Sequence, residues 1–77
     1  MQNERIIADH NSEYHIDNCD FPYWANRSIK RKLHILDMRE FDKITGLDIM
    51  KINGIGFRLL KILQTKLDSM GLRLKNG

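Results

Sequence analysis

The sequence has only one cysteine and one proline among its 77 residues, and its apolar runs never exceed three positions. A single cysteine, Cys19, cannot form an internal disulfide, so we expect a reducing, cytoplasmic environment rather than a disulfide-stabilised secreted domain. The short apolar runs exclude a membrane-spanning segment and a secretory leader. We therefore expect no membrane partner.

The short length also limits what the chain can be. Seventy-seven residues fill one small domain and bury about 60% of the unfolded surface, which leaves little structure for a catalytic pocket. The sequence shows no convergent nucleophile, base or acid pair, and we interpret Asp37 and Glu40 as helix-start residues. We therefore expect a binding protein rather than an enzyme, with no small-molecule substrate and no cofactor.

The formal net charge of +3 is unevenly divided along the chain. Residues 1–26 carry one basic and five acidic side chains, whereas residues 27–77 carry twelve basic and five acidic ones. The two parts thus have net charges of −4 and +7. A basic domain joined to an acidic arm indicates an anionic partner such as nucleic acid. The alternative is that the charges serve only solubility.

Two regions are expected along the chain. Residues 1–20 show little periodicity and are predicted to form an acidic arm or a short hairpin, with residues 5–8 and 13–16 as its strands. Residues 21–77 are predicted to form the folded domain. Its start, around Phe21, is expected to be extended because Pro22 disfavours a helical conformation in the preceding residue.

Helical signals follow in close succession after this start. Asn26 or Ser28 is the expected N-cap of a helix that continues to about His34. Asp37 and Thr45 each precede an acidic residue by three positions, which is typical of helix starts. The residues expected to face the core from these segments are Ile29, Leu33, Met38, Phe41, Leu47, Ile49 and Met50.

The last helix is predicted to run from Phe57 to about Met70. Leucines at positions 60, 63 and 67 recur there at helical spacing. Gly71 is typical of the left-handed residue that ends a helix, and Leu72 can make the accompanying hydrophobic contact. The sequence therefore predicts an all-α fold, a compact bundle of four to five short helices.

The stretch Asn53-Gly54-Ile55-Gly56 separates two of these helices and forms a helix-hairpin-helix pattern. The glycines allow close approach of the backbone to a ligand, and Ile55 is expected to enter the core. Free N–H groups at the start of the last helix can bind a phosphate. Arg58 and Lys61 can add charge-assisted contacts. The alternative is that Gly54 and Gly56 serve only a sharp turn between packed helices.

Residues 37–74 resemble the C-terminal domain of the bacterial RNA polymerase alpha subunit. The matching runs are residues 45–51, the sequence IGFRLL at residues 55–60 and the sequence LDSMGLRL at residues 67–74. Residues 26–28 resemble the start of that family's first helix. The resemblance implies an alpha-C-terminal-domain-like (SAM-domain-like) fold in a bacterial or phage protein. It also implies docking on the DNA backbone across an A·T-rich minor groove, and contacts with sigma factors and activators.

The resemblance can be carried over residue by residue. Gly56 matches the hairpin glycine of the family and Arg58 its phosphate-contacting lysine. Either Asn26 or Arg27 aligns with its first-helix arginine, and Arg27 has the side chain suited to a narrow minor groove. Together with the basic residues near these positions, the expected DNA-binding residues are Arg27, Lys30, Arg31, Gly54, Gly56, Arg58 and Lys61.

Some positions depart from the family pattern. Leu59 stands where the family has serine, and Phe57 occupies a position that is usually polar. If both are exposed, they form a hydrophobic patch that binds a protein, because exposed apolar surface commonly marks a partner. The alternative function is therefore a protein-interaction module that binds RNA polymerase or a transcription factor through Phe57 and Leu59.

A group of potential metal ligands lies near the N-terminus: His10, His15, Cys19 and either Asp17 or Asp20. Imidazole, thiolate and carboxylate groups are the usual zinc ligands, but their spacing here matches no zinc pattern. The sequence alone therefore predicts no metal site.

Overall fold

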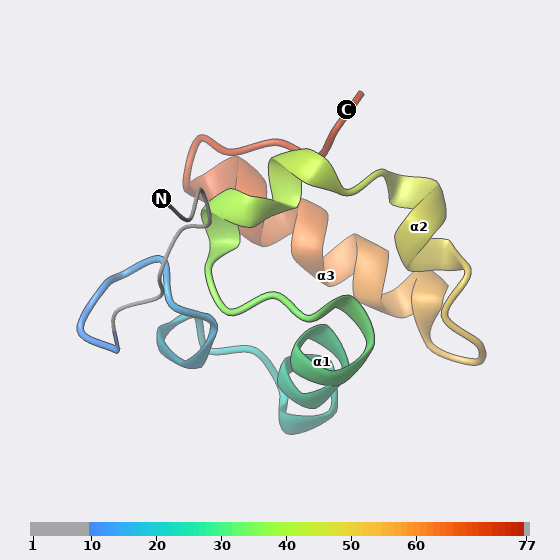
Figure 1. The fold of residues 1–77 in the computed structure, drawn as a ribbon, viewed down its shortest axis with the longest axis horizontal. Coiled ribbons are helices and arrows are strands. Elements are labelled where there is room, and N and C mark those ends of the chain that lie inside the picture. The colour runs from blue at the N-terminus through green and yellow to red at the C-terminus, as the bar shows by residue number, and fades with distance from the viewer. Residues whose placement is uncertain (1–9, 77) are drawn as a thin grey trace, which may run out of the picture.

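The computed structural model describes residues 10–76, which are folded into short helices (Figure 1). These residues contain no strand, and the only β-type pairing among them is an isolated bridge between His15 and Asp37. The predicted all-α class is thus confirmed for this part of the chain. The helical elements in chain order are η1 (Ile16–Asn18), α1 (Tyr23–Ser28), η2 (Ile29–Leu33), η3 (Met38–Lys43), α2 (Gly46–Met50) and α3 (Gly56–Ser69).

Helix α3 is the longest element and supplies the centre of the core. Its buried residues Leu59, Leu63 and Leu67 are four positions apart and form one apolar face. In Figure 1, α3 crosses the middle of the molecule, with α1 on one side and η3 on the other. The core residues contributed by the other elements are Ile16, Cys19, Ala25, Ile29, Ile35, Met38, Phe41, Ile49 and Leu74.

Two helix-end predictions are confirmed. The Thr45 side chain accepts a hydrogen bond from the N–H of Asp48, whose carboxylate accepts one from the N–H of Thr45. At the other end of the fold, Gly71 has φ +73° and the N–H of Leu72 donates to the Leu67 carbonyl at 2.8 Å. This second pattern is a Schellman motif.

The start of the first helix differs from the prediction. Helix α1 begins at Tyr23, with Pro22 as the N-cap residue at φ −56°, so Asn26 and Ser28 lie inside the helical run. The fixed φ of proline is compatible with a helix start and explains the earlier beginning. The helix then widens into the π-helical η2, which ends at His34 in a left-handed conformation.

The burial predictions are partly wrong. Met38, Phe41 and Ile49 are buried as expected, but Leu47 is 71% and Met50 45% exposed. Helix α2 has five residues, so it makes little more than one turn. One turn buries a narrow face, which Ile49 occupies. Leu33, also expected in the core, is half-buried at its edge.

The predicted boundary at residue 21 lies inside the packed unit. The N–H of Ile16 donates to the Leu36 carbonyl at 2.9 Å, and the N–H of Met38 donates to the Tyr14 carbonyl at 2.8 Å. Ile16 and Cys19 are buried in the core. The expected hairpin strand at residues 13–16 therefore does not form: these residues are joined to residues 36–38 by an isolated bridge, and Ile16 begins η1. The other expected strand, residues 5–8, lies outside the described residues.

No helix within residues 10–76 has the length and apolar character needed to cross a bilayer.

Candidate nucleic-acid interface

The hairpin between α2 and α3 is fixed by its two glycines. A β-carbon at Gly56 would lie 2.5 Å from the Ile49 carbonyl oxygen and 2.7 Å from that of Met50, so only glycine allows this approach of the helices. Gly54 has φ +83°, a left-handed conformation that favours glycine. A β-carbon at Gly54 would meet no atom within 4 Å, so its surface is open to a ligand.

Helix α3 begins with the features of an anion-binding end. No side chain caps its N-terminus, and its first turn contains no acidic residue. Ile55, the residue before the helix, packs against the core as predicted. Arg58 and Lys61 are exposed and lie one turn apart on the helix. The positive end of the helix dipole and these two cations can act on the same anion.

A second basic surface lies on the first helical run. Arg27 and Arg31, from α1 and η2, line one shallow hollow together with Ser28 and Lys32. Both arginines are exposed, as a DNA contact requires. Lys61 of α3 lines a separate groove against the segment that leads into α1. The predicted basic residues are thus distributed over two neighbouring parts of the fold.

Lys30 differs from the other four predicted basic contacts. Its ammonium nitrogen lies 2.5 Å from Asp17 Oδ1, and its side chain is 33% exposed. Hydrogen bonds from Lys30 and then Asn26 hold the pKa of Asp17 below its ordinary value. Lys30 is therefore engaged in anchoring residues 10–18 to the first helix.

The predicted protein-interaction pair does not form one surface. Phe57 is 74% exposed, but Leu59 is completely buried. Leu59 belongs to the apolar face of α3, four residues before Leu63, so its prediction as an interaction residue is wrong. Leu47 and Met50 are exposed instead. We call Leu47, Met50 and Phe57 the hairpin apolar patch.

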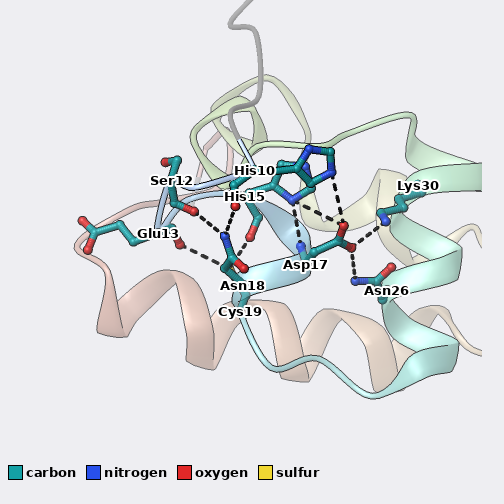
Figure 2. A network of polar contacts seen from close by, with 9 residues as sticks. All are labelled: His10, Ser12, Glu13, His15, Asp17, Asn18, Cys19, Asn26 and Lys30. Carbon is teal, nitrogen blue, oxygen red and sulfur yellow. Dashed lines mark hydrogen bonds and ion pairs between the residues drawn. The ribbon is translucent and has the colours of Figure 1, made fainter.

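Three of the potential metal ligands named from the sequence, His10, His15 and Asp17, come together in one cluster, although their spacing alone predicted no site (Figure 2). The two imidazole rings stack with their centroids 4.3 Å apart. One ring nitrogen of each histidine and a carboxylate oxygen of Asp17 all lie within 4.8 Å of one another. The tight turn between the two histidines produces this convergence, and spacing in the sequence does not reveal it.

Cys19 is not part of this cluster. Its thiol is buried and donates to the backbone carbonyl of His15 at 3.3 Å. Burial raises the pKa of the thiol, so the neutral form is favoured. Cys19 thus behaves as a small core residue and not as a nucleophile.

Comparisons of the chain with protein-family models, with curated proteins and with solved structures give no match.

Proposed function

We propose that the protein is a DNA-binding module that contacts the DNA backbone through its helix-hairpin-helix, with a fold like that of the RNA polymerase alpha C-terminal domain. The observation that carries the proposal is the start of α3. This 14-residue helix follows a hairpin fixed by Gly54 and Gly56, has no capping side chain and exposes Arg58 and Lys61 near its N-terminus.

The proposed chemistry is phosphate binding without base reading. Main-chain N–H groups at the start of α3 and the helix dipole favour a phosphate oxygen. Arg58 adds a forked, charge-assisted donor, and Lys61 adds a second positive charge. Arg27 and Arg31 on the first helical run extend the contact toward the minor groove, whose narrow A·T-rich form attracts arginine.

The direct test is fluorescence anisotropy of a labelled A·T-rich duplex titrated with the protein at increasing salt. Each neutralised phosphate contributes roughly −0.9 to the slope of log K against log salt. Four basic contacts therefore predict a slope of about −3 to −4. Arg58→Ala should weaken binding to all sequences and reduce the magnitude of the slope by about one.

The matched control for this experiment is Lys43→Ala. Lys43 is exposed at the end of η3, outside the proposed interface, and its replacement removes the same single charge. Binding that is insensitive to salt, or that falls equally in Arg58→Ala and Lys43→Ala, would contradict the proposed contact.

The hairpin apolar patch favours a second candidate function, protein binding. Leu47, Met50 and Phe57 are 71%, 45% and 74% exposed and come from the two helices that flank the hairpin. We propose as the alternative that this surface docks on RNA polymerase or a transcription factor. Phe57→Ser should then abolish binding to that protein, whereas Arg58→Ala should leave it unchanged.

A further inference from the structure

We propose that His10, His15 and Asp17 form a binding site for a divalent transition metal of the zinc class. This site is separate from the proposed DNA contact, because His15 and Asp17 lie at the start of η1 and His10 lies in the turn before it, outside the helix-hairpin-helix. Two imidazoles and one carboxylate are a common ligand set for such ions, and a water molecule can complete the coordination.

The distances to the Asp17 carboxylate support this assignment. His10 Nε2 lies 3.8 Å and His15 Nδ1 lies 3.7 Å from Asp17 Oδ2. Both separations are too long for a hydrogen bond. Ligand atoms on one tetrahedral zinc ion are about 3.3–3.4 Å apart, given bond lengths of about 2.0–2.1 Å. A contraction of a few tenths of an ångström therefore brings each histidine to metal-binding distance from the carboxylate. The two ring nitrogens, which lie within 4.8 Å of each other, must approach further by rotation of the exposed His10 ring.

The carboxylate is already oriented for this role. Asp17 Oδ1 accepts hydrogen bonds from Lys30 Nζ and Asn26 Nδ2, at 2.5 Å and 3.1 Å. Both donors come from the first helical run (Figure 2). With Oδ1 held in this way, Oδ2 faces the two imidazoles. Partners that fix a ligand from behind are a regular feature of metal sites.

Contacts within residues 10–18 also hold the two histidines in place. His15 is 2% exposed, so its ring has little freedom to move. The side-chain amide of Asn18 donates to the carbonyls of His10 and Ser12 at 2.6 Å and 2.9 Å, which fixes the backbone next to the first ligand. His10 is 81% exposed and leaves one side of the cluster open for the ion and its water.

Two local interactions oppose the ion and limit its affinity. The N–H of Asp17 donates to His15 Nδ1 at 3.0 Å, and the metal must take over that lone pair. The Lys30 ammonium also places a positive charge beside the carboxylate. We therefore expect reversible binding of one ion by a chain that is folded without it.

The test is calorimetric titration of the untagged, chelator-treated full chain with zinc chloride. We expect one equivalent of Zn²⁺ to bind, and His10→Ala or Asp17→Asn to weaken binding by at least about tenfold. His10→Ala is the cleaner variant, because the exposed ring contributes little to packing. His34→Asn is the matched control, since His34 is exposed outside the cluster at φ +58°, a conformation that asparagine tolerates.

Nuclear magnetic resonance of the imidazole nitrogens gives a second readout, with His10 Nε2 and His15 Nδ1 shifting on zinc addition and His34 not. The proposal is overturned if no saturable binding occurs, if His10→Ala binds zinc as the unmodified chain does, or if His34→Asn loses as much affinity as His10→Ala.

Discussion

Gly56 and Ile49 are in such close contact that a β-carbon on Gly56 would lie 2.5 Å from the Ile49 carbonyl oxygen. This contact joins the last turn of α2 to the first turn of α3 and sets the angle at which α3 leaves the hairpin. The direction in which Arg58 points thus depends on a glycine with no charge of its own. Folding and the proposed phosphate contact are linked at this residue.

Gly56→Ala should destabilise the protein by about 1–3 kcal/mol, because the backbone must move to accept the methyl group. Gly46→Ala is the matched control in α2, where a β-carbon would meet Leu60 Cδ1 at 3.6 Å, an ordinary contact. Its effect should be neutral or stabilising by up to about 1 kcal/mol. Urea unfolding of both variants measures the difference, and equal stabilities would contradict the close-contact account.

Gly54→Ala should cost about 1–2 kcal/mol for a different reason. No atom lies within 4 Å of a β-carbon there, but φ is +83°, and an L-residue is strained in that conformation. Gly54→Asn should be less destabilising, because asparagine tolerates left-handed conformations better than alanine. Urea unfolding that ranks alanine as the milder substitution would argue against backbone strain at this turn.

Truncation of Leu59 should destabilise the fold strongly, whereas truncation of Phe57 should have little effect. Leu59→Ala should destabilise the fold by about 2–5 kcal/mol, since it removes a completely buried side chain from α3. Phe57→Ala should change stability by less than about 0.5 kcal/mol, because the ring is 74% exposed. Thermal or urea unfolding checks both values. A large loss of stability in Phe57→Ala would show that the ring packs against the core.

Asp37 should account for part of the stability that the protein loses at acid pH. The carboxylate is fully buried, and hydrogen bonds from the Arg39 guanidinium, at 2.9 and 2.6 Å, hold its pKa below the ordinary value. The unfolded chain therefore binds this proton at a higher pH than the folded chain. The resulting stability is complete above about pH 5 and is lost as the pH falls through the lowered native pKa.

Asp37→Asn should accordingly destabilise the protein by about 1–3 kcal/mol at neutral pH and make the remaining stability less dependent on pH in the acid range. Urea unfolding at a series of pH values measures both effects. Asp42→Asn, an exposed position on the same element, is the control. An unchanged acid dependence in Asp37→Asn would exclude Asp37 as its source.

The elements that depend on local sequence were the predictable ones. The leucine spacing of α3, the Thr45 capping box and the Gly71 helix end each involve residues no more than five positions apart. Such patterns specify backbone geometry directly, and the helix and both helix ends are confirmed. The buried face of α3 is Leu59, Leu63 and Leu67, whereas Leu60, predicted in this row, is half-buried. The sequence also indicated that the turn between α2 and α3 needs glycine at positions 54 and 56. Gly56 is buried against the carbonyl groups of Ile49 and Met50, so its prediction as a DNA-contact residue is wrong and its role lies in the turn itself.

The features that depend on distant parts of the chain were not predictable in this way. The pairing of residues 14–16 with residues 36–38 brings the N-terminal segment into the core, which no local pattern indicates. The exposure of Leu47 follows from the shortness of α2. Lys30 is held by Asp17, thirteen residues earlier, so its charge is partly used within the protein.

The most direct test of the proposed function is a titration of the ¹⁵N-labelled protein with an A·T-rich duplex, followed by amide chemical shifts at low and moderate salt. DNA binding at this surface predicts shifts that include Arg58 and Lys61 as well as Arg27 and Arg31 and that diminish as salt rises. Shifts confined to Leu47, Met50 and Phe57 that persist at moderate salt, or no shifts even at low salt, would contradict the proposed DNA contact.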